Sequence, residues 1–366
     1  MMKSKPDLTL GYSRRKGDHV IRAYSEVLPN GIDVMYPTSV GNTKKSINYL
    51  FKDLSAQIKG SFTESYIRRK FNDVDIPHLK NFLEGENFHS SGCNIFELID
   101  KVKNSFTKSY ITIQIDSSLQ LLPWEIIPHP NGNSLLGDFC IFNYQIDDLY
   151  PKIKKSFHEN PIRVRVSQDT SLIGSAQEKI DLQSIKEFNC EFLPPIVSSS
   201  EKEEFFDFFC DKKYNVVHFG CHCSYFKSGG IFSITTDRSI NIDLHDFRKN
   251  KKKWPSGAFY FLNTCNSAPN IDNIDNSISS YVLKQLDPGA AIATTFKIKD
   301  QDAVNFSKEF YQASLMTDSL GKPVSIAAAM MYARKAMKNE GSIAGYLYRV
   351  IGNPDFRMVG RIVGDK

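Results

Sequence analysis

The sequence lacks most of the short motifs that identify a protein from a single stretch of residues. It has no C-x-x-C pair, no G-x-x-x-x-G-K loop and no G-x-G-x-x-G after a strand, so nothing predicts nucleotide-driven chemistry. The first residues lack the apolar core of a secretory signal, and no 18-residue window is free of charged or polar breaks. We therefore expect neither a leader nor a membrane span.

Cysteine is scarce and irregularly spaced. The seven cysteines are Cys93, Cys140, Cys190, Cys210, Cys221, Cys223 and Cys265. An odd number without a regular framework favours reduced thiols in the cytoplasm. A zinc site that uses Cys210, Cys221, Cys223 and either neighbouring histidine is an alternative, but two ligands that directly flank a third do not easily close a tetrahedron.

The sequence also lacks a large excess of either sign of charge. Lys and Arg number 46 against 41 Asp and Glu, which leaves a net charge of +5. This balance disfavours nucleic acid as a direct ligand, and the basic run at 248–254 is more often a solvated loop than an RNA site. With 41% hydrophobic and 24% charged residues, the chain is typical of globular proteins, and its length predicts two or three domains.

Short apolar runs alternate with helical patterns from residue 109 onward. The expected strands are 110–115, 162–166, 192–193, 215–219, 258–262, 290–296 and 356–359, and the expected helices are 176–188, 201–210, 302–314, 324–338 and 342–350. This rhythm predicts an α/β fold with a mainly parallel sheet flanked by helices on both faces.

The first hundred residues give weaker signals. They predict a strand at 20–27, a bend at 29–31, and helices near 45–58 and 95–103. We interpret residues 1–105 as an α+β accessory region. The polar stretch 147–160 is typical of a connector between two units.

Two predicted strands run into polar segments that carry reactive side chains. Residues 216–219 lead into Gly-Cys-His-Cys at 220–223, and residues 259–262 lead into Asn-Thr-Cys-Asn at 263–266. Because reactive groups gather beyond the carboxyl ends of parallel strands, an imidazole and a thiol would share one crevice if these strands are neighbours. Such a pair suits acyl transfer: the imidazole favours the thiolate, which attacks an acyl carbon, and the imidazolium then protonates the leaving amine.

Each of these residues also has a simpler interpretation. Cys265 taken alone is more often a small buried apolar side chain than a nucleophile. His218 competes with His222, but strand alternation places His218 within the sheet as a core histidine, while His222 lies beyond the strand end. Backbone N–H groups of Cys265 and of Cys223, the residue after the histidine, are the expected donors to an oxyanion.

Several motifs in this order resemble the CHAT-domain peptidases, which are caspase-like relatives of caspases, metacaspases and separase. The likeness covers roughly Phe106 to Val359. Its parts are Leu-Pro-Trp-Glu at 122–125, Val-Val-His-Phe-Gly-Cys-His at 216–222, Phe-Leu-Asn-Thr-Cys-Asn at 261–266, Asp-Pro-Gly-Ala at 287–290, Asp300 before a helix with Phe310-Tyr311, and Gly-Asn-Pro at 352–354. Two positions depart from the family pattern: Cys223 stands where Gly is usual, and Asn266 where an acidic residue is common.

The resemblance implies a cysteine endopeptidase with His222 and Cys265 as its dyad and with no metal or organic cofactor. It divides the chain into the accessory region, residues 106–155 as the first part of the CHAT region, and residues 156–366 as the catalytic domain. It also implies one specific protein substrate and an activating or inhibiting protein partner, in bacterial defence or programmed death. The alternative is a catalytically silent scaffold of the same fold.

Substrate-binding residues follow from the same resemblance. In the wider superfamily the residue two before the nucleophile often lines the primary pocket, and here it is Asn263. Asp272, Asp275 and Asp300 are further candidates from neighbouring loops.

Overall fold

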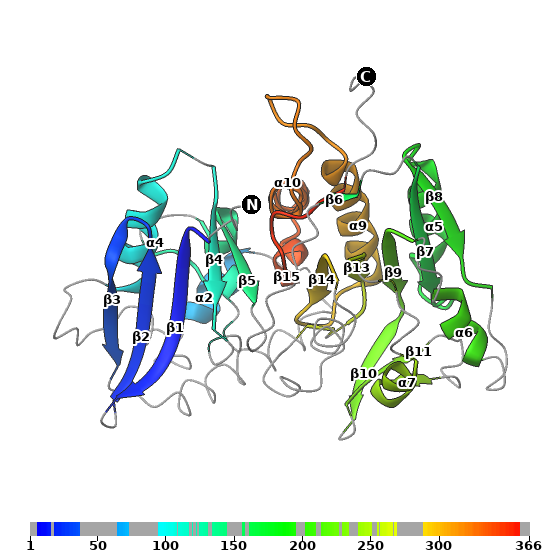
Figure 1. Cartoon of the computed structure of the whole chain (residues 1–366), viewed down its shortest axis with the longest axis horizontal. Helices are drawn as coiled ribbons and strands as arrows, with labels where there is room; N and C mark the ends of the chain where they lie inside the picture. Colours follow the sequence, from blue (N-terminus) through cyan, green and yellow to red (C-terminus); the bar gives the residue numbers. More distant parts are fainter. Residues whose placement is uncertain are drawn as a thin grey trace. The chain divides into compact units, whose positions relative to one another are not determined.

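Figure 1 shows the computed structural model of the chain. It describes residues 6–15, 18–36, 64–72, 94–107, 109–116, 119, 122, 124–130, 134–144, 156–157, 161–194, 202–209, 214–226, 229–233, 241–250, 255, 257–265, 267–268 and 288–358. The chain divides into two compact units, Met1–Asp147 and Asp148–Lys366. Among the described residues, no helix is both long enough and apolar enough to cross a lipid bilayer.

The first unit is built on a mixed sheet. Its strands run in the order β3-β2-β1-β4-β5, with an antiparallel meander of the first three and parallel pairing from β1 to β4 to β5. The bounds are β1 (Leu8–Arg15), β2 (Asp18–Ser25), β3 (Leu28–Tyr36), β4 (Ile111–Ile115) and β5 (Cys140–Tyr144), with helices α2 (Glu64–Asn72) and α4 (Ile95–Asn104) and the short 3-10 helices η2 (Trp124–Ile126) and η3 (Leu136–Asp138). This confirms the mixed character expected of the amino-terminal region.

Helix α4 begins where its sequence provides a cap. The Asn94 side chain accepts from the backbone N–H of Glu97, and the Glu97 carboxylate accepts from the backbone N–H of Asn94, so two otherwise unpaired donors are satisfied. The buried face consists of Ile95, Phe96, Leu98, Ile99 and Val102. The helix expected at 95–103 is confirmed, whereas the one expected at 45–58 lies outside the described residues.

The bend expected at 29–31 is wrong. These residues lie inside β3, and the chain turns earlier, at residues 26–27. Ser25 stabilises this early turn, because its hydroxyl donates to the carbonyl of Asp7 at 2.6 Å and accepts from the backbone N–H of Val27 at 3.4 Å. A register shift between Ala23 and Ser25 accompanies the turn.

The second unit contains the predicted parallel sheet. Its strands run in the order β15-β14-β13-β9-β7-β8, and every neighbouring pair is parallel except β14 with β15. The bounds are β7 (Ile162–Gln168), β8 (Phe188–Phe192), β9 (Val216–Gly220), β13 (Phe259–Leu262), β14 (Ala290–Thr294) and β15 (Tyr348–Gly352). Smaller sheets are formed by β10 (His222–Phe226), β11 (Gly229–Ser233) and β12 (Asn241–Asp243), and by β6 (Ser156–Phe157) with β16 (Arg357–Met358).

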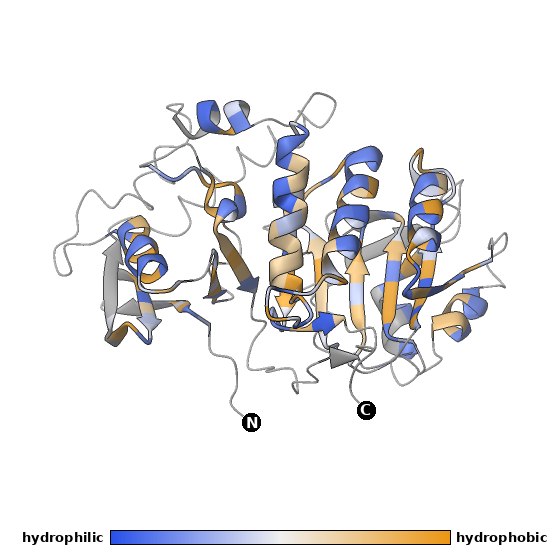
Figure 2. Ribbon diagram, turned by 90° about the horizontal axis from the view of Figure 1, so that it is seen from above, coloured by the Kyte–Doolittle hydropathy of each residue, from blue (hydrophilic) through white to orange (hydrophobic). Residues whose placement is uncertain are grey.

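Helices cover both faces of this sheet, as strand alternation shows. His218 and Phe219 are successive residues of β9 and point to opposite faces. His218 packs against Tyr311 on α9, whereas Phe219 packs against Phe205 and Phe209 on α6. In Figure 2 the strands are coloured largely as hydrophobic and the helices carry hydrophilic residues. The predicted α/β architecture is confirmed.

The helices of the second unit follow the predicted rhythm. Their bounds are α5 (Ser175–Ser184), α6 (Lys202–Phe209), α7 (Leu244–Lys249), α9 (Asp300–Ser314), α10 (Ile326–Asn339) and the 3-10 helix η6 (Ala344–Leu347). Helices α9 and α10 pack against each other, and α5 packs against α9 on the His218 side of the sheet.

Two of these predictions place helix where the structure has strand. The helix expected at 342–350 is reduced to η6, and Tyr348–Gly352 pairs with the edge of β14 as β15. The buried guanidinium of Arg334 donates to the carbonyls of Gly345 and Tyr348, which holds the chain in this sharp transition. Helix α5 likewise ends at Ser184, because residues from 188 onward pair with β7.

Gly289 provides a test of the packing at the start of β14. A Cβ on this residue would overlap the ring of Phe356 and lie 2.8 Å from the carbonyl oxygen of Gly257, which is backbone and cannot rotate away. We expect Gly289→Ala to destabilise the protein by about 1–3 kcal/mol, measured as a lower urea midpoint in far-UV circular dichroism.

Gly11→Ala is the matched control for this test. Gly11 lies in β1, and the nearest atom to an added Cβ is the carbonyl oxygen of Arg22 at 3.8 Å, an ordinary contact. Its midpoint should stay within experimental error of the wild type or rise slightly. An equal loss in the two variants would contradict the packing argument.

Candidate active site

The polar side chains of the second unit meet where three parallel strands end. Strands β7, β9 and β13 are neighbours in this part of the sheet, with His218 in register with Phe261. Beyond their carboxyl ends lies a small pocket of about 30 Å³. The first turns of α5 and α9 also line it, through Ser175 and Asp300. His222 and Cys265 both line this pocket, so the two strand ends singled out in the sequence do share one crevice.

Cys265 follows β13 and is partly exposed. Its Sγ accepts from the backbone N–H of Ile298 at 3.5 Å and lies 3.8 Å from the carbonyl oxygen of the same residue. Burial raises the pKa of the Cys265 thiol above its ordinary value of 9.0, the charge of Asp300 raises it further, and the contacts with Ile298 and the charge of Lys297 lower it in part. At neutral pH the side chain in this state is therefore a thiol.

His222 is the first residue of β10, not part of a loop as the sequence suggested. It pairs with Ser233 of β11, and the next residue, Cys223, lies opposite Phe232. The hairpin therefore carries the imidazole and fixes the backbone around it. The ring is partly exposed, and its Nε2 lies 3.8 Å from Oδ2 of Asp169.

Asp169 is a residue that the sequence reasoning missed. It follows β7, is fully buried, and its Oδ1 accepts from the backbone N–H of Ser171 at 2.9 Å and from the Ser171 hydroxyl at 2.6 Å. The signal that could have found it was its position, because it follows the strand predicted at 162–166.

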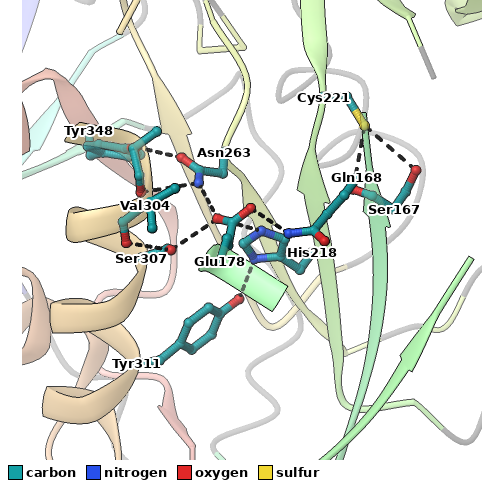
Figure 3. A network of polar contacts seen from close by, with 11 residues as sticks. Ser167, Gln168, Glu178, His218, Cys221, Asn263, Val304, Ser307, Tyr311 and Tyr348 are labelled. Atoms are coloured by element: carbon teal, nitrogen blue, oxygen red, sulfur yellow. Dashed lines mark hydrogen bonds and ion pairs between the residues drawn. The ribbon is translucent and has the colours of Figure 1, made fainter. Parts of the chain in front are cut away.

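Figure 3 shows a buried polar network, two members of which, Glu178 and Asn263, also line the pocket. At its centre is Glu178 of α5, whose Oε1 accepts from the Asn263 amide at 2.7 Å and the Ser307 hydroxyl at 3.0 Å. The same oxygen lies 3.2 Å from Nε2 of His218, and Oε2 accepts from Gln168 at 2.8 Å. The sequence reasoning also missed Glu178, because an acidic residue in the first turn of a largely polar helix resembles a solvated one.

His218 belongs to this network and not to the pocket lining. The ring is fully buried, stacks on Phe261 with centroids 5.1 Å apart, and its Nδ1 lies 3.0 Å from the hydroxyl of Tyr311. The interpretation of His218 as a core histidine is confirmed.

The neighbours of Glu178 stabilise the ionised form of its carboxyl. Burial alone would raise the pKa of its carboxyl, but attraction to His218 and the hydrogen bonds from Gln168 and Asn263 outweigh burial and lower the pKa below the ordinary 4.5. Gly220 makes room for this carboxylate, since a Cβ there would lie 2.6 Å from its Oε2. A buried anion therefore forms part of the pocket lining.

The four predicted substrate-binding residues fall into two groups. Asn263 lines the pocket, but its amide is already used: it donates to Glu178 and accepts from the Tyr348 hydroxyl at 2.5 Å. Asp300 lines the pocket at the start of α9, and its carboxylate accepts from the backbone N–H of Ile173 at 3.1 Å. Asp272 and Asp275 lie outside the described residues.

Comparison with known proteins defines the fold. No family model matches the sequence, and no curated protein matches it either. Among solved structures, the separase of Saccharomyces cerevisiae in its complex with securin is similar with a TM-score of 0.52 at 12% identity. The match covers 96% of this chain, which spans 30% of that separase chain. The fold is caspase-like.

A second similar structure is the Arg-specific cysteine proteinase gingipain R, RgpB of Porphyromonas gingivalis. It matches with a TM-score of 0.47 at 10% identity, over 74% of this chain and 69% of its own.

Glu178→Gln tests the buried network through its dependence on pH. Because the folded-state pKa of Glu178 is lowered, its ionisation stabilises the protein fully above about pH 4.5, and this stability disappears as the pH falls through the folded-state pKa. We expect the variant to be about 3 kcal/mol less stable at pH 7. The difference from the wild type should shrink below pH 4.5, measured as urea midpoints across a pH series.

Glu309→Gln is the control, because this carboxyl lies on α9, as Ser307 does, but is only partly buried and is not a member of the Glu178 network. Its midpoint difference from the wild type should be small and should not change between pH 7 and pH 4. A constant difference for Glu178→Gln over the same range would contradict the argument.

Proposed function

We propose that this chain is a cysteine endopeptidase in which Cys265 is the nucleophile and His222 transfers the protons. The observation that carries the proposal is that these two side chains line one pocket beyond the ends of the adjacent parallel strands β9 and β13. A thiol and an imidazole at the carboxyl edge of a parallel sheet suit acyl transfer to water. The caspase-like fold supports the same reaction class by analogy.

The chemistry starts from the protonated thiol. Because burial raises the pKa of Cys265, the imidazole of His222 has to act as a general base that removes the S–H proton as the S–C bond forms. The backbone N–H groups of Cys265 and Cys223 are the proposed donors to the oxyanion. The imidazolium then protonates the leaving amine, and water hydrolyses the thioester with the same histidine as its base.

The size of the pocket favours an enzyme that is restrained at rest. At about 30 Å³ the pocket is far smaller than a typical ligand pocket of roughly 300–1,000 Å³. We propose that a protein partner opens the pocket when it activates the enzyme, or keeps it closed when it inhibits the enzyme. The separase structure, which was solved as a complex with securin, is an analogy for such a partner.

The narrower parts of the proposal rest on the sequence resemblance. We propose membership of the CHAT family, one protein substrate, a role in bacterial defence or programmed death, and a cytoplasmic location, for which the free thiols of Cys140, Cys190, Cys221 and Cys265 are the support. Residues 156–366 are the proposed catalytic domain, 106–155 the first part of the CHAT region, and 1–105 an accessory region. Asn263, Asp272, Asp275 and Asp300 are the proposed substrate-binding residues.

Cys265→Ala tests the enzyme directly. Purified wild type and variant are incubated with cell lysate or with the protein encoded by the neighbouring gene, and the products are separated by gel electrophoresis and mass spectrometry. We expect a discrete cleavage by the wild type that the variant reduces by at least about 10³-fold, because the covalent step is lost.

Cys190→Ala serves as the control variant. Cys190 is a partly exposed thiol whose Sγ donates to the carbonyl of Leu182, outside the pocket lining. It should cleave at the wild-type rate. No discrete product from the wild type with any lysate or partner, or equal products from Cys265→Ala, would contradict the peptidase proposal.

Labelling with a thiol-reactive peptide electrophile separates the enzyme from the silent scaffold. We expect selective labelling of Cys265 that falls at least about tenfold in His222→Gln, because the imidazole assists thiolate formation. Burial raises the pKa of the Cys190 and Cys221 thiols to about 12, so both should react slowly with or without His222. Uniform slow labelling that ignores His222 would favour the scaffold.

A further inference from the structure

The two carboxylate oxygens of Asp169 differ in their hydrogen bonds. Oδ1 accepts both hydrogen bonds from Ser171, whereas Oδ2 is buried and has no hydrogen-bond partner among the residues that the structure describes. Asp169 is fully buried. An unpaired carboxylate oxygen in a buried site is costly, and such groups normally have a partner.

The polar atom that faces this oxygen is a ring nitrogen of the proposed catalytic histidine. Oδ2 of Asp169 lies 3.8 Å from Nε2 of His222. The backbone keeps the two residues together, because the N–H of Asp169 donates to the carbonyl of Gly220 at 2.9 Å, two residues before His222. The loop after β7 is therefore bonded to the end of the strand that leads into the histidine.

The side chain of Asp169 is also held in one orientation. Its two bonds from Ser171 hold Oδ1, and its carbonyl accepts from the backbone N–H of Leu172 at 3.1 Å. The remaining oxygen, Oδ2, therefore faces the imidazole of His222. A distance of 3.8 Å is within ion-pair range, and a closure of about 1 Å would form a hydrogen bond, as happens when catalytic contacts tighten on substrate binding.

We propose that Asp169 is the positioning residue of the active site, so that the site is a Cys265–His222–Asp169 triad. In this arrangement Asp169 accepts from Nε2–H of His222, which makes Nδ1 the basic nitrogen. During acylation the S–H proton of Cys265 moves to Nδ1 as the S–C bond forms, Asp169 stays ionised beside the imidazolium, and the same proton then goes to the leaving amine. The role of Asp169 in the reaction rests on the proposed function, but the effect of Asp169 on the tautomer of His222 does not.

The need for such a residue follows from the state of the thiol. A thiol and imidazole that formed an ion pair at rest would need little help to move the proton. Here burial keeps Cys265 protonated, so the imidazolium forms only during the reaction, close to the carboxylates of Glu178 and Asp300, which also line the pocket. Asp169 is placed to stabilise that charge at the ring itself.

Nitrogen NMR of labelled histidine tests the proposal without any need for turnover. The chain has 8 histidines, and comparison with His222→Gln assigns the ring of interest at a pH where it is neutral. We expect the Nε2–H tautomer in the wild type. In Asp169→Asn the amide can donate to Nε2, so the ring should shift toward the Nδ1–H tautomer.

Asp7→Asn is the matched control. Asp7 is another buried aspartate whose oxygen accepts from a backbone N–H and a hydroxyl, both of Thr112, at 2.8 and 3.0 Å. It belongs to the first unit and should leave the His222 tautomer and the turnover number unchanged. Asp169→Asn should lower kcat by about 10²-fold or more with little change in KM, while Asp169→Glu should recover part of the loss.

The outcomes separate the two proposals. An Nδ1–H tautomer in the wild type, or the same tautomer in the wild type and Asp169→Asn, would overturn the role of Asp169; the first of these does not depend on the folding of Asp169→Asn. A tautomer that shifts in Asp169→Asn would support it even if no peptide were cleaved, in which case the peptidase proposal alone would fail. Equal kcat values for Asp169→Asn and Asp7→Asn would also overturn it.

Discussion

The buried carboxylate of Glu178 is the interaction on which the architecture of the site depends. It joins α5 to β9 through His218, to the residue after β13 through Asn263, and to α9 through Ser307. A charge of this kind is tolerated in the interior only when every neighbouring group compensates it. The strand ends and helix starts around the pocket are therefore held by one shared anion.

This arrangement explains how a partly exposed thiol and imidazole are kept at a defined place. Asn263 is two residues before Cys265, and its amide is bonded both to Glu178 and to the hydroxyl of Tyr348. His218 is four residues before His222 and is stacked on Phe261. The two reactive side chains thus extend from segments that the core fixes, which is the usual way in which a rigid scaffold positions a functional loop.

The same structure also restrains reactivity. Burial and the charge of Asp300 raise the pKa of Cys265, and the pocket that this residue lines is small, at about 30 Å³. Asp169 supplies the charge that the imidazole would need when the proton moves. In the proposed enzyme these two effects are compatible. Opening of the pocket removes the restraint on Cys265, whereas the carboxylate of Asp169 keeps its place after β7.

The sequence by itself determined the alternation of strands and helices in the second unit, the parallel sheet, and the two strand ends that carry His222 and Cys265. Apolar periodicity and the residues after each strand are local features of the chain, and local features can be recognised from the order of residues alone. It did not reveal that residues 348–352 form a strand, because that segment pairs only once β14 offers its edge. Asp169 and Glu178 are ordinary acidic residues in the sequence. Only the tertiary structure decided that one lies beside His222 and that the other lines the pocket, since burial and charge compensation depend on contacts between segments far apart in the chain.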